Sequence, residues 1–402
     1  MNMHGRKSIV PPDDDVLENI AASFFRAKKE INEALTRLAD TIAFEQVRKI
    51  IEDVYKLGRL EAVSEIEGGY VNKSYQATAT ANGSTVEYFV RKYRSNVTDE
   101  DILFEHSMIE HAVSNGMDGL SRVYRQPDGR SFFRMREITG GKVISRAFAV
   151  YQFLDGEDRY AWLDNRMTPG EDRSYGALLA KFHDCMSGFD PGLKAEPSIE
   201  EHLPAMRERF AICHEPLSSG DRFRGLWEKS LSSLLAACDE AIARAAGGYW
   251  VDLPRCACHC DYHPGNVKWK GEKCASIFDL DWSKMDMRLF DVSCAVIYAC
   301  ASWESADNGE IDFERVEYVL SGYDEYLSEH GSFLRFTREE KDAFPQMMKT
   351  GIVYLFDWLL VYCEDAENLN EFEYYYYLCH YVNALDCLNR NQRRLGEIIS
   401  RI

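Results

Sequence analysis

The chain has 402 residues, 46% of them hydrophobic and 28% charged, with a formal net charge of −19. This composition is that of a globular protein with one large core or two domains. The negative charge argues against nucleic-acid binding, which needs clustered positive charge to displace counterions. No apolar run approaches the roughly 20 residues that span a bilayer, and the N-terminus lacks the basic and apolar regions of a signal peptide. We predict a cytoplasmic monomer or homodimer with no membrane or nucleic-acid partner.

The first 57 residues are predicted to form a helical extension, in which an amphipathic stretch runs from Phe44 to Tyr55. From residue 58 the spacing of apolar residues changes to the two-residue alternation of β-strands. The pair Asn82-Gly83 is typical of a hairpin turn. The predicted strands are residues 62–66, 74–81, 86–93, 120–124, 131–137 and 146–154. With a helix at 99–115, they predict a small antiparallel lobe over residues 58–154.

From residue 155 to residue 402 the pattern is mainly helical. The predicted helices are residues 175–183, 199–213, 220–246, 287–303, 309–329, 337–363 and 368–398. Residues 256–282 contain the only clear strand pair that we predict in this half.

Twelve cysteines are present, and no Cys-x-x-Cys pair occurs among them. Most lie in apolar stretches, where a free thiol behaves as a small hydrophobe. Cys256, Cys258 and Cys260 alternate next to His259, but residues at i, i+2 and i+4 of a strand share one face without closing a tetrahedron around an ion. We therefore expect these cysteines to be packing residues.

The strongest motif lies between two apolar runs and reads His259-Cys260-Asp261-Tyr262-His263-Pro264-Gly265-Asn266. A carboxylate, Asp279, follows Asn266 thirteen residues later. Asp261 is placed to orient a hydroxyl group and accept its proton, whereas the oxygens of Asn266 and Asp279 are hard ligands that suit magnesium. The motif predicts phosphoryl transfer from ATP with Mg²⁺.

Glycines in the first turn of the small lobe, Gly68-Gly69, are followed by Asn72 and Lys73. This is not a Walker A loop, because no Gly-Lys-Ser/Thr ends it. Two adjacent glycines most often simply form a turn between strands. Their position before a basic strand residue favours a second role, in which backbone amides approach phosphates.

At this point the chain resembles the aminoglycoside phosphotransferase and choline kinase family, small-molecule relatives of protein kinases, over about residues 58–390. Order and spacing are most similar to bacterial homoserine kinases of this fold, which share the helix containing Phe356-Asp357-Trp358-Leu359. The residues that carry the family resemblance are Gly68-Gly69, Asn72-Lys73, Arg91, Glu105, the helix from Leu178 to His183, His259, Asp261, Asn266, Asp279 and Phe290-Asp291-Val292.

The resemblance implies an α+β, bilobal, protein-kinase-like fold. Residues 58–154 would form a nucleotide-binding N-lobe with a small antiparallel sheet and one αC-type helix. Residues 155–402 would form a large, mainly helical C-lobe with the catalytic loop and the acceptor pocket.

For the nucleotide, the resemblance implies that Arg91 contacts the phosphates and that Glu105 braces it. Gln152 and Leu154, in the hinge near residues 151–156, would also contact the nucleotide, together with Gly68, Gly69 and Asn72. Protein kinases have lysine at the position of Arg91. Lys92 therefore remains an alternative, on the opposite face of the strand.

In the catalytic loop, the resemblance makes His259 a scaffold residue and Asp291 a brace that accepts backbone hydrogen bonds. For two residues, the sequence leaves more than one role possible. Asp281 is either a second magnesium ligand, a substrate contact or a surface residue, and His263 either faces the substrate or belongs to the loop structure.

The predicted reaction is phosphorylation of a hydroxyl group on a small molecule. A protein acceptor is the first alternative, but no Ala-Pro-Glu segment occurs and Asp291 follows Asp279 by only twelve residues. A silent nucleotide-binding regulator is the second, although Asp261, Asn266 and Asp279 are all present. Homoserine, an amino alcohol such as choline, an aminoglycoside and a sugar all remain candidate acceptors. Trp282, Tyr354 and Trp358 would suit a cationic one.

Overall fold

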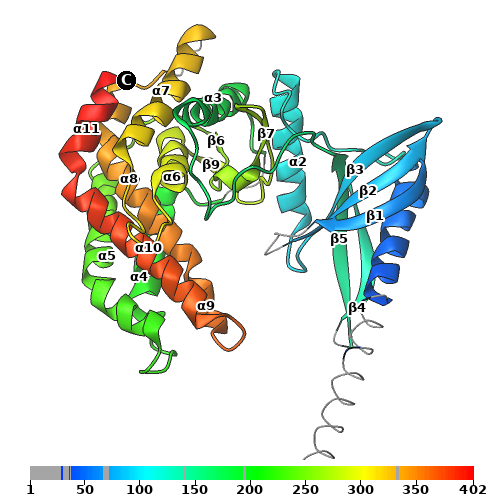
Figure 1. The fold of residues 1–402 in the computed structure, drawn as a ribbon, viewed down its shortest axis with the longest axis horizontal. Coiled ribbons are helices and arrows are strands. Elements are labelled where there is room, and N and C mark those ends of the chain that lie inside the picture. The colour runs from blue at the N-terminus through cyan, green and yellow to red at the C-terminus, as the bar shows by residue number, and fades with distance from the viewer. Residues whose placement is uncertain are drawn as a thin grey trace, which may run out of the picture. The chain divides into compact units, whose positions relative to one another are not determined.

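The computed structural model describes Lys29, Thr36 and residues 38–66, 72–139, 141–192, 196–331 and 335–402. They form two compact units (Figure 1). The first takes the described residues up to Ser95 together with Tyr124–Val150, and the second takes Asn96–Val123 together with Tyr151–Ile402. Our domain boundaries at residues 57 and 154 stay predictions. The first part of the predicted helical extension and the Gly68-Gly69 turn lie outside the described residues.

The first unit is built on an antiparallel sheet of five strands in the order β1-β2-β3-β5-β4. The strands are β1 (Arg59–Ile66), β2 (Lys73–Ala81), β3 (Ser84–Lys92), β4 (Phe132–Thr139) and β5 (Lys142–Gln152). Asn82 and Gly83 have φ values of +50° and +82°, which is the conformation that a two-residue hairpin requires. This confirms the predicted hairpin between β2 and β3.

A short π-helix, η1 (Lys49–Val54), follows the helical residues 38–48 and covers one face of this sheet. Its buried residues Ile50 and Ile51 belong to one apolar cluster with Tyr75, Tyr88 and Val90 of the strands. The segment 120–124, which we predicted as a strand, makes only isolated bridges. The prediction of a strand there was wrong, because the segment pairs only through single residues, Leu120 with Ile277 of β8 (Lys273–Ile277) and Val123 with Tyr151 of β5.

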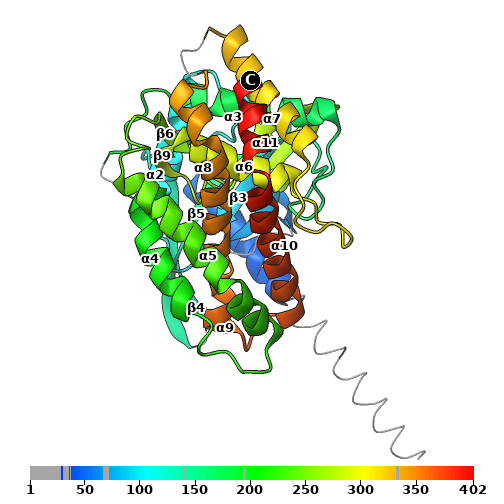
Figure 2. The same cartoon turned by 90° about the vertical axis from the view of Figure 1, so that its left-hand side faces the viewer.

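The second unit is mainly helical. Its helices are α2 (Asp99–Ser114), α3 (Pro169–Cys185), α4 (Ile199–Ile212), α5 (Arg222–Ala246), α6 (Arg288–Cys300), α7 (Phe313–Glu329), α8 (Arg338–Trp358), α9 (Leu360–Asp365), α10 (Glu371–Arg390) and α11 (Gln392–Arg401). Two predicted helices, 337–363 and 368–398, are each divided in the structure, at Leu359 and Asn391. Figure 2 shows α5, α8 and α10 packed beside one another.

Helices α3 and α7 approach each other especially closely. A Cβ on Gly176 of α3 would lie 2.0 Å from the Val319 carbonyl oxygen, and a Cβ on Gly322 would lie 2.0 Å from that of Arg173. Only glycine permits this backbone approach. It brings His183 of α3 to Tyr323 of α7, whose hydroxyl lies 2.8 Å from His183 Nδ1.

Four short strands carry the motif region. Strand β6 (Arg255–Cys258) pairs with β9 (Lys284–Met287), and β7 (Val267–Lys270) pairs with β8. Our prediction of a single strand pair missed β9, since four residues directly before a helix carry too little periodicity to be recognised. Among the described residues, no helix is both long enough and apolar enough to cross a membrane.

Candidate active site

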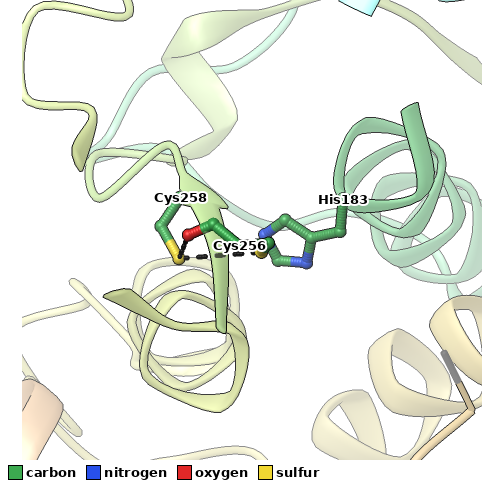
Figure 3. Close-up of side chains that lie close together, drawn as sticks. All are labelled: His183, Cys256 and Cys258. Atoms are coloured by element: carbon green, nitrogen blue, oxygen red, sulfur yellow. Dashed lines mark hydrogen bonds between the residues drawn. The ribbon is translucent and has the colours of Figure 1, made fainter. Parts of the chain in front are cut away.

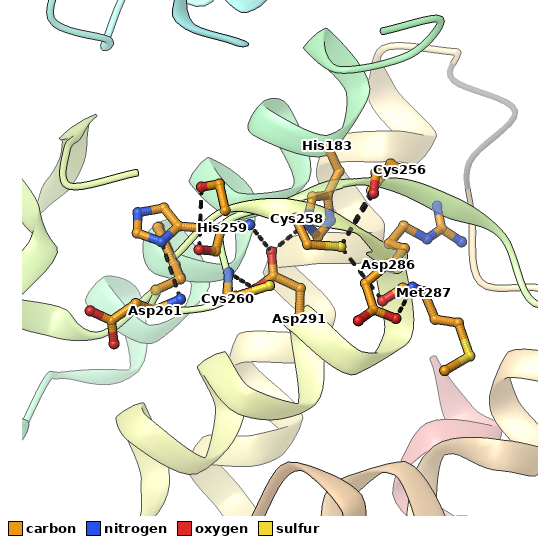
Figure 4. Close-up of polar contacts among 12 residues, drawn as sticks. His183, Cys256, Cys258, His259, Cys260, Asp261, Asp286, Met287 and Asp291 are labelled. Atoms are coloured by element: carbon orange, nitrogen blue, oxygen red, sulfur yellow. Dashed lines mark hydrogen bonds and ion pairs between the residues drawn. The ribbon is translucent and has the colours of Figure 1, made fainter. Parts of the chain in front are cut away.

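Asp291, near the start of α6, holds the backbone of the catalytic loop. Its Oδ2 accepts hydrogen bonds from the His259 amide (2.7 Å) and from His183 Nε2 (2.9 Å), and its Oδ1 accepts one from the Cys260 amide (2.8 Å). Figure 4 shows these contacts converging on its carboxylate. Burial raises the pKa of Asp291, but the hydrogen bond and charge of His183 outweigh burial, so the pKa lies below its usual value. The carboxylate is therefore ionised and can clamp both amides.

The clamp holds Cys260 in an unusual backbone conformation. Its φ is +62°, a region that costs a residue with a side chain about 1 kcal/mol or more. The next residue is Asp261. The strain at Cys260 therefore turns the chain sharply out of β6 and presents the Asp261 side chain at the end of the strand.

His259, the predicted scaffold residue, is bonded at both ring nitrogens to the backbone. Its side chain is fully buried; Nε2 lies 3.0 Å from the Phe278 carbonyl oxygen, and Nδ1 accepts the Asp261 amide at 3.3 Å. The carbonyl requires a proton on Nε2, and the amide requires a lone pair on Nδ1. Burial lowers the pKa of His259, which favours this neutral form. Both bonds fix the loop, which supports the predicted scaffold role.

Asn266 and Asp279 are brought together by strands β7 and β8. Val267 pairs with Ile277, so the residues just outside that pair, Asn266 and Phe278, are also adjacent, and the Phe278 amide donates to the Asn266 carbonyl oxygen (3.1 Å). Asp279 follows with a φ of +66°. The Nδ2 of Asn266 donates to the Asp261 carbonyl oxygen (2.9 Å) and to Asp261 Oδ2 (3.2 Å). With Nδ2 engaged in this way, Oδ1 is the Asn266 atom that would ligate a metal, and the metal-binding roles of Asn266 and Asp279 stay predictions.

Asp261 lies in an electrostatically unfavourable position for a carboxylate. Burial, and next the negative charge of Asp279, raise the pKa of Asp261 to about 8, although hydrogen bonds from Tyr298 and Asn266 oppose the rise. A cation bound at Asn266 and Asp279 would counteract the charge of Asp279. The donor set of neutral and anionic oxygens fits a hard divalent ion.

Tyr298 is a site residue that our sequence reasoning missed. Its hydroxyl donates to Asp261 Oδ1 at 3.0 Å, so both carboxylate oxygens of Asp261 are held by neighbouring side chains. Tyr298 lies seven residues after Asp291 on α6, and residues seven apart share one face of a helix. That spacing is the signal that would have indicated it.

The two open residues lie in different surroundings. His263 accepts the Gly265 amide at Nδ1 (3.0 Å), and its Nε2 lies 3.9 Å from Asp261 Oδ2. Burial lowers the pKa of His263 to about 4, so the ring is neutral near pH 7. Asp281 is half-buried, and its negative charge contributes to the raised pKa of Asp261. Both residues therefore lie near Asp261, and their roles stay predictions.

The residues predicted to bind the nucleotide are distributed over both units. In the first unit, Arg91 is buried on β3, while the Lys92 ammonium lies 2.7 Å from Glu137 Oε1 on β4. Asn72 Oδ1 accepts the Arg94 amide (2.9 Å). Gly68 and Gly69 lie outside the described residues.

In the second unit, Glu105 on α2 is buried, and its Oε1 accepts the Tyr151 hydroxyl (3.1 Å). The Gln152 amide donates to the Arg122 carbonyl oxygen (2.8 Å), and Leu154 is half-buried. Contact of these three residues with a nucleotide, and the brace between Glu105 and Arg91, stay predictions.

Comparison with known proteins identifies the class. The family described as "Phosphotransferase enzyme family" matches residues 62–326. Among solved structures, amicoumacin kinase in complex with AMP-PNP, Ca²⁺ and Ami has a TM-score of 0.60 at 15% identity, over 88% of this chain and 93% of that one. Choline kinase from Cryptosporidium parvum has a TM-score of 0.56 at 12% identity, over 89% and 99%. These structures confirm the protein-kinase-like α+β fold.

The chain belongs to the phosphotransferase enzyme family, since the match covers more than half of its length. It is a small-molecule kinase, a phosphotransferase with an alcohol group as acceptor. Within the family it is similar to the homoserine kinases of Zymomonas mobilis and Methylocella silvestris. Each is 22% identical, over 77% and 76% of this chain and 83% and 84% of the relative. The predicted resemblance is confirmed.

Proposed function

We propose that this kinase transfers the γ-phosphoryl group of ATP, with Mg²⁺, to the hydroxyl group of a small amine-bearing alcohol, and that homoserine is the first acceptor to test. The observation that carries the proposal is the fixed position of Asp261. Its backbone neighbours are clamped by Asp291, and its two carboxylate oxygens accept bonds from Tyr298 and Asn266.

Asp261 orients the acceptor hydroxyl towards the phosphorus atom and takes its proton late in the transfer. Asn266 and Asp279 hold Mg²⁺ through their side-chain oxygens, and His259 and Asp291 keep the loop in place. When bound, the metal neutralises charge on the transferring phosphate. Catalysis by this site is therefore positioning and charge compensation, with no covalent intermediate on the protein.

On the nucleotide side, we propose Arg91 rather than Lys92 as the phosphate contact. The two residues point to opposite faces of β3, and Lys92 is engaged by Glu137. Glu105, Asn72, Gly68, Gly69, Gln152 and Leu154 complete the proposed nucleotide site on the strength of the family resemblance.

The acceptor proposal is supported by the curated relatives and by aromatic residues in the second unit. Trp162 packs edge-on against Trp303 and Trp358, with ring centroids 5.1 and 5.8 Å apart, and Trp358 is partly exposed. Such rings attract an ammonium group. Tyr354, one of the aromatic residues first considered, suits a ligand less well, because its ring centroid already lies 5.9 Å from the Lys284 ammonium. The carboxylate of Asp357, next to Trp358, is already paired with Arg209.

The test is ADP formation from ATP and Mg²⁺ with homoserine, choline, ethanolamine, an aminoglycoside and a sugar offered in turn. We expect turnover that depends on one acceptor class and on Mg²⁺. Asp261→Asn should lower kcat by about 10²- to 10⁴-fold, whereas Asp252→Asn, an exposed carboxylate before β6, should not change it. Unchanged turnover in the Asp261 variant would contradict the assignment. The cytoplasmic location and the monomeric or dimeric state stay predictions.

A further inference from the structure

A second group of ligand-type side chains lies directly behind the catalytic loop. His183 of α3 meets Cys256 and Cys258 of β6, and their nitrogen and sulfur atoms all lie within 4.8 Å of one another (Figure 3). The three side chains are buried. We expected these cysteines to be packing residues because one strand face cannot surround an ion. The structure adds the third ligand from a different element.

We propose that His183, Cys256 and Cys258 form an inhibitory site for a soft divalent cation such as Zn²⁺ or Cd²⁺, separate from the oxygen site at Asn266 and Asp279. The binding half of this proposal is independent of the proposed function. The inhibition half rests on it.

Ligand type and spacing support the site. Imidazole nitrogen and thiolate sulfur are the donors that zinc prefers, whereas Mg²⁺ binds oxygen. Two sulfurs at about 2.3 Å from a tetrahedral zinc lie about 3.8 Å apart, and the sulfurs of Cys256 and Cys258 are 4.0 Å apart. Binding releases the two thiol protons to solvent, and the two thiolates then balance the charge of the cation.

Binding would disconnect the catalytic clamp. One ring nitrogen of His183 lies within 4.8 Å of both cysteine sulfurs, and in Figure 3 the ring edge that carries Nε2, the nitrogen farther from the α3 backbone, is turned towards Cys256. This is the nitrogen that donates to Asp291 Oδ2 at 2.9 Å (Figure 4). A cation on Nε2 displaces the proton that Nε2 donates to Asp291, and this proton is released to solvent. The ring keeps its proton on Nδ1, where the Tyr323 hydroxyl, 2.8 Å away, can accept it. Asp291 then loses one of its three donors.

Loss of the hydrogen bond from His183 to Asp291 would also displace Asp261, through the backbone of the loop. Asp291 also holds the amides of His259 and Cys260, and Cys260 keeps its φ of +62° only while it is held. With the clamp weakened, the loop relaxes and Asp261 leaves its position. The buried site also predicts slow uptake, because the cation must wait for a local opening of the fold.

The test uses Cd²⁺ alone as the probe, on the full chain in which the three cysteines that are not buried have been replaced: Cys213→Ser, Cys363→Ser and Cys379→Ser. After long incubation and desalting, we expect one Cd²⁺ per chain and the ultraviolet charge-transfer band of cadmium thiolate. Adding Cys256→Ala and Cys258→Ala should abolish both signals. Adding Cys294→Ala and Cys300→Ala, buried thiols of α6, should leave them intact.

Two measurements report whether Asp291 still holds the loop. Amide hydrogen exchange at residues 259–262 should become faster in the loaded protein, whether or not the protein turns over ATP. ADP formation should fall in proportion to bound Cd²⁺ and return when a chelator removes it. If the double alanine variant fails to fold, Cys258→Ala alone, which leaves two ligands, should lower retention at least tenfold. Equal retention in the variants lacking Cys256 and Cys258, or no retention in the starting protein, would overturn the proposal.

Discussion

The Asp291 clamp can be tested by replacing its carboxylate with an amide of the same shape. In Asp291→Asn, the amide oxygen can still occupy the Oδ2 position and accept from His259 and His183, but the –NH₂ group then faces the Cys260 amide, which is also a donor. One charge-assisted hydrogen bond is lost, worth about 1.5–3 kcal/mol, and a buried N–H is left without an acceptor, at about 1–3 kcal/mol.

The expected loss in the free energy of unfolding is therefore about 3–5 kcal/mol, in the range seen when one partner of a buried pair is removed. The lowered pKa of Asp291 supports this estimate, because the site favours an ionised group over a neutral one although burial opposes ionisation. A displaced Cys260 also moves Asp261, and a misplacement of about 1 Å costs roughly 100-fold in rate. We expect kcat to fall by about that factor.

Urea unfolding followed by tryptophan fluorescence measures the stability change. All seven tryptophans lie in the second unit, so the signal reports the unit that contains Asp291. Asp252→Asn, at an exposed position, is the control and should change stability by no more than about 0.5 kcal/mol. A variant that unfolds within 1 kcal/mol of the wild type and keeps its kcat would refute the clamp.

Three further predictions test other contacts. Tyr298→Phe removes the bond to Asp261 Oδ1 and should lower kcat at least about tenfold without changing the KM for ATP; an unchanged kcat would remove Tyr298 from the site. Gly322→Ala should lower the free energy of unfolding by at least about 2 kcal/mol, because the added Cβ would meet a backbone oxygen at 2.0 Å. Gly225→Ala on α5, where a Cβ would meet no atom within 4 Å beyond its chain neighbours and its own helix backbone, is the control and should leave stability unchanged or raise it. Urea unfolding compares the two variants. Burial lowers the pKa of His380 to about 3, so as the pH falls below about 6.5 the unfolded chain binds a proton that the folded chain does not, and His380 should cost about 2 kcal/mol of stability at pH 5. His380→Gln should therefore reduce the loss in the free energy of unfolding between pH 7 and pH 5. An equal loss in the variant and the wild type would contradict this pH dependence.

The motif residues were predictable because their chemistry is local. Asp261, Asn266 and Asp279 lie within nineteen residues, and two short strands joined by a tight turn bring the last two together. Most helices of the second unit were also predictable, since an apolar face at helical spacing must be buried. Strand β9 was missed because its four residues directly before a helix carry too little periodicity, and its partner β6 lies in a distant part of the chain.

By itself, the sequence determined the class of reaction and the fold class, and it predicted the residues proposed to handle the acceptor hydroxyl and the metal, because these depend on residue type at short spacing. The family resemblance also predicted Asp291 as a brace of the loop, but only the tertiary structure showed which amides it holds and that Tyr298 joins it. Asp291 lies thirty residues after Asp261 and reaches the loop through the packing of α6, and Tyr298 reaches Asp261 from the same helix. His183 meets Cys256 and Cys258 because α3 packs against β6. Such contacts depend on how whole helices and strands pack, and no local pattern in the chain encodes how close two distant elements lie in the fold.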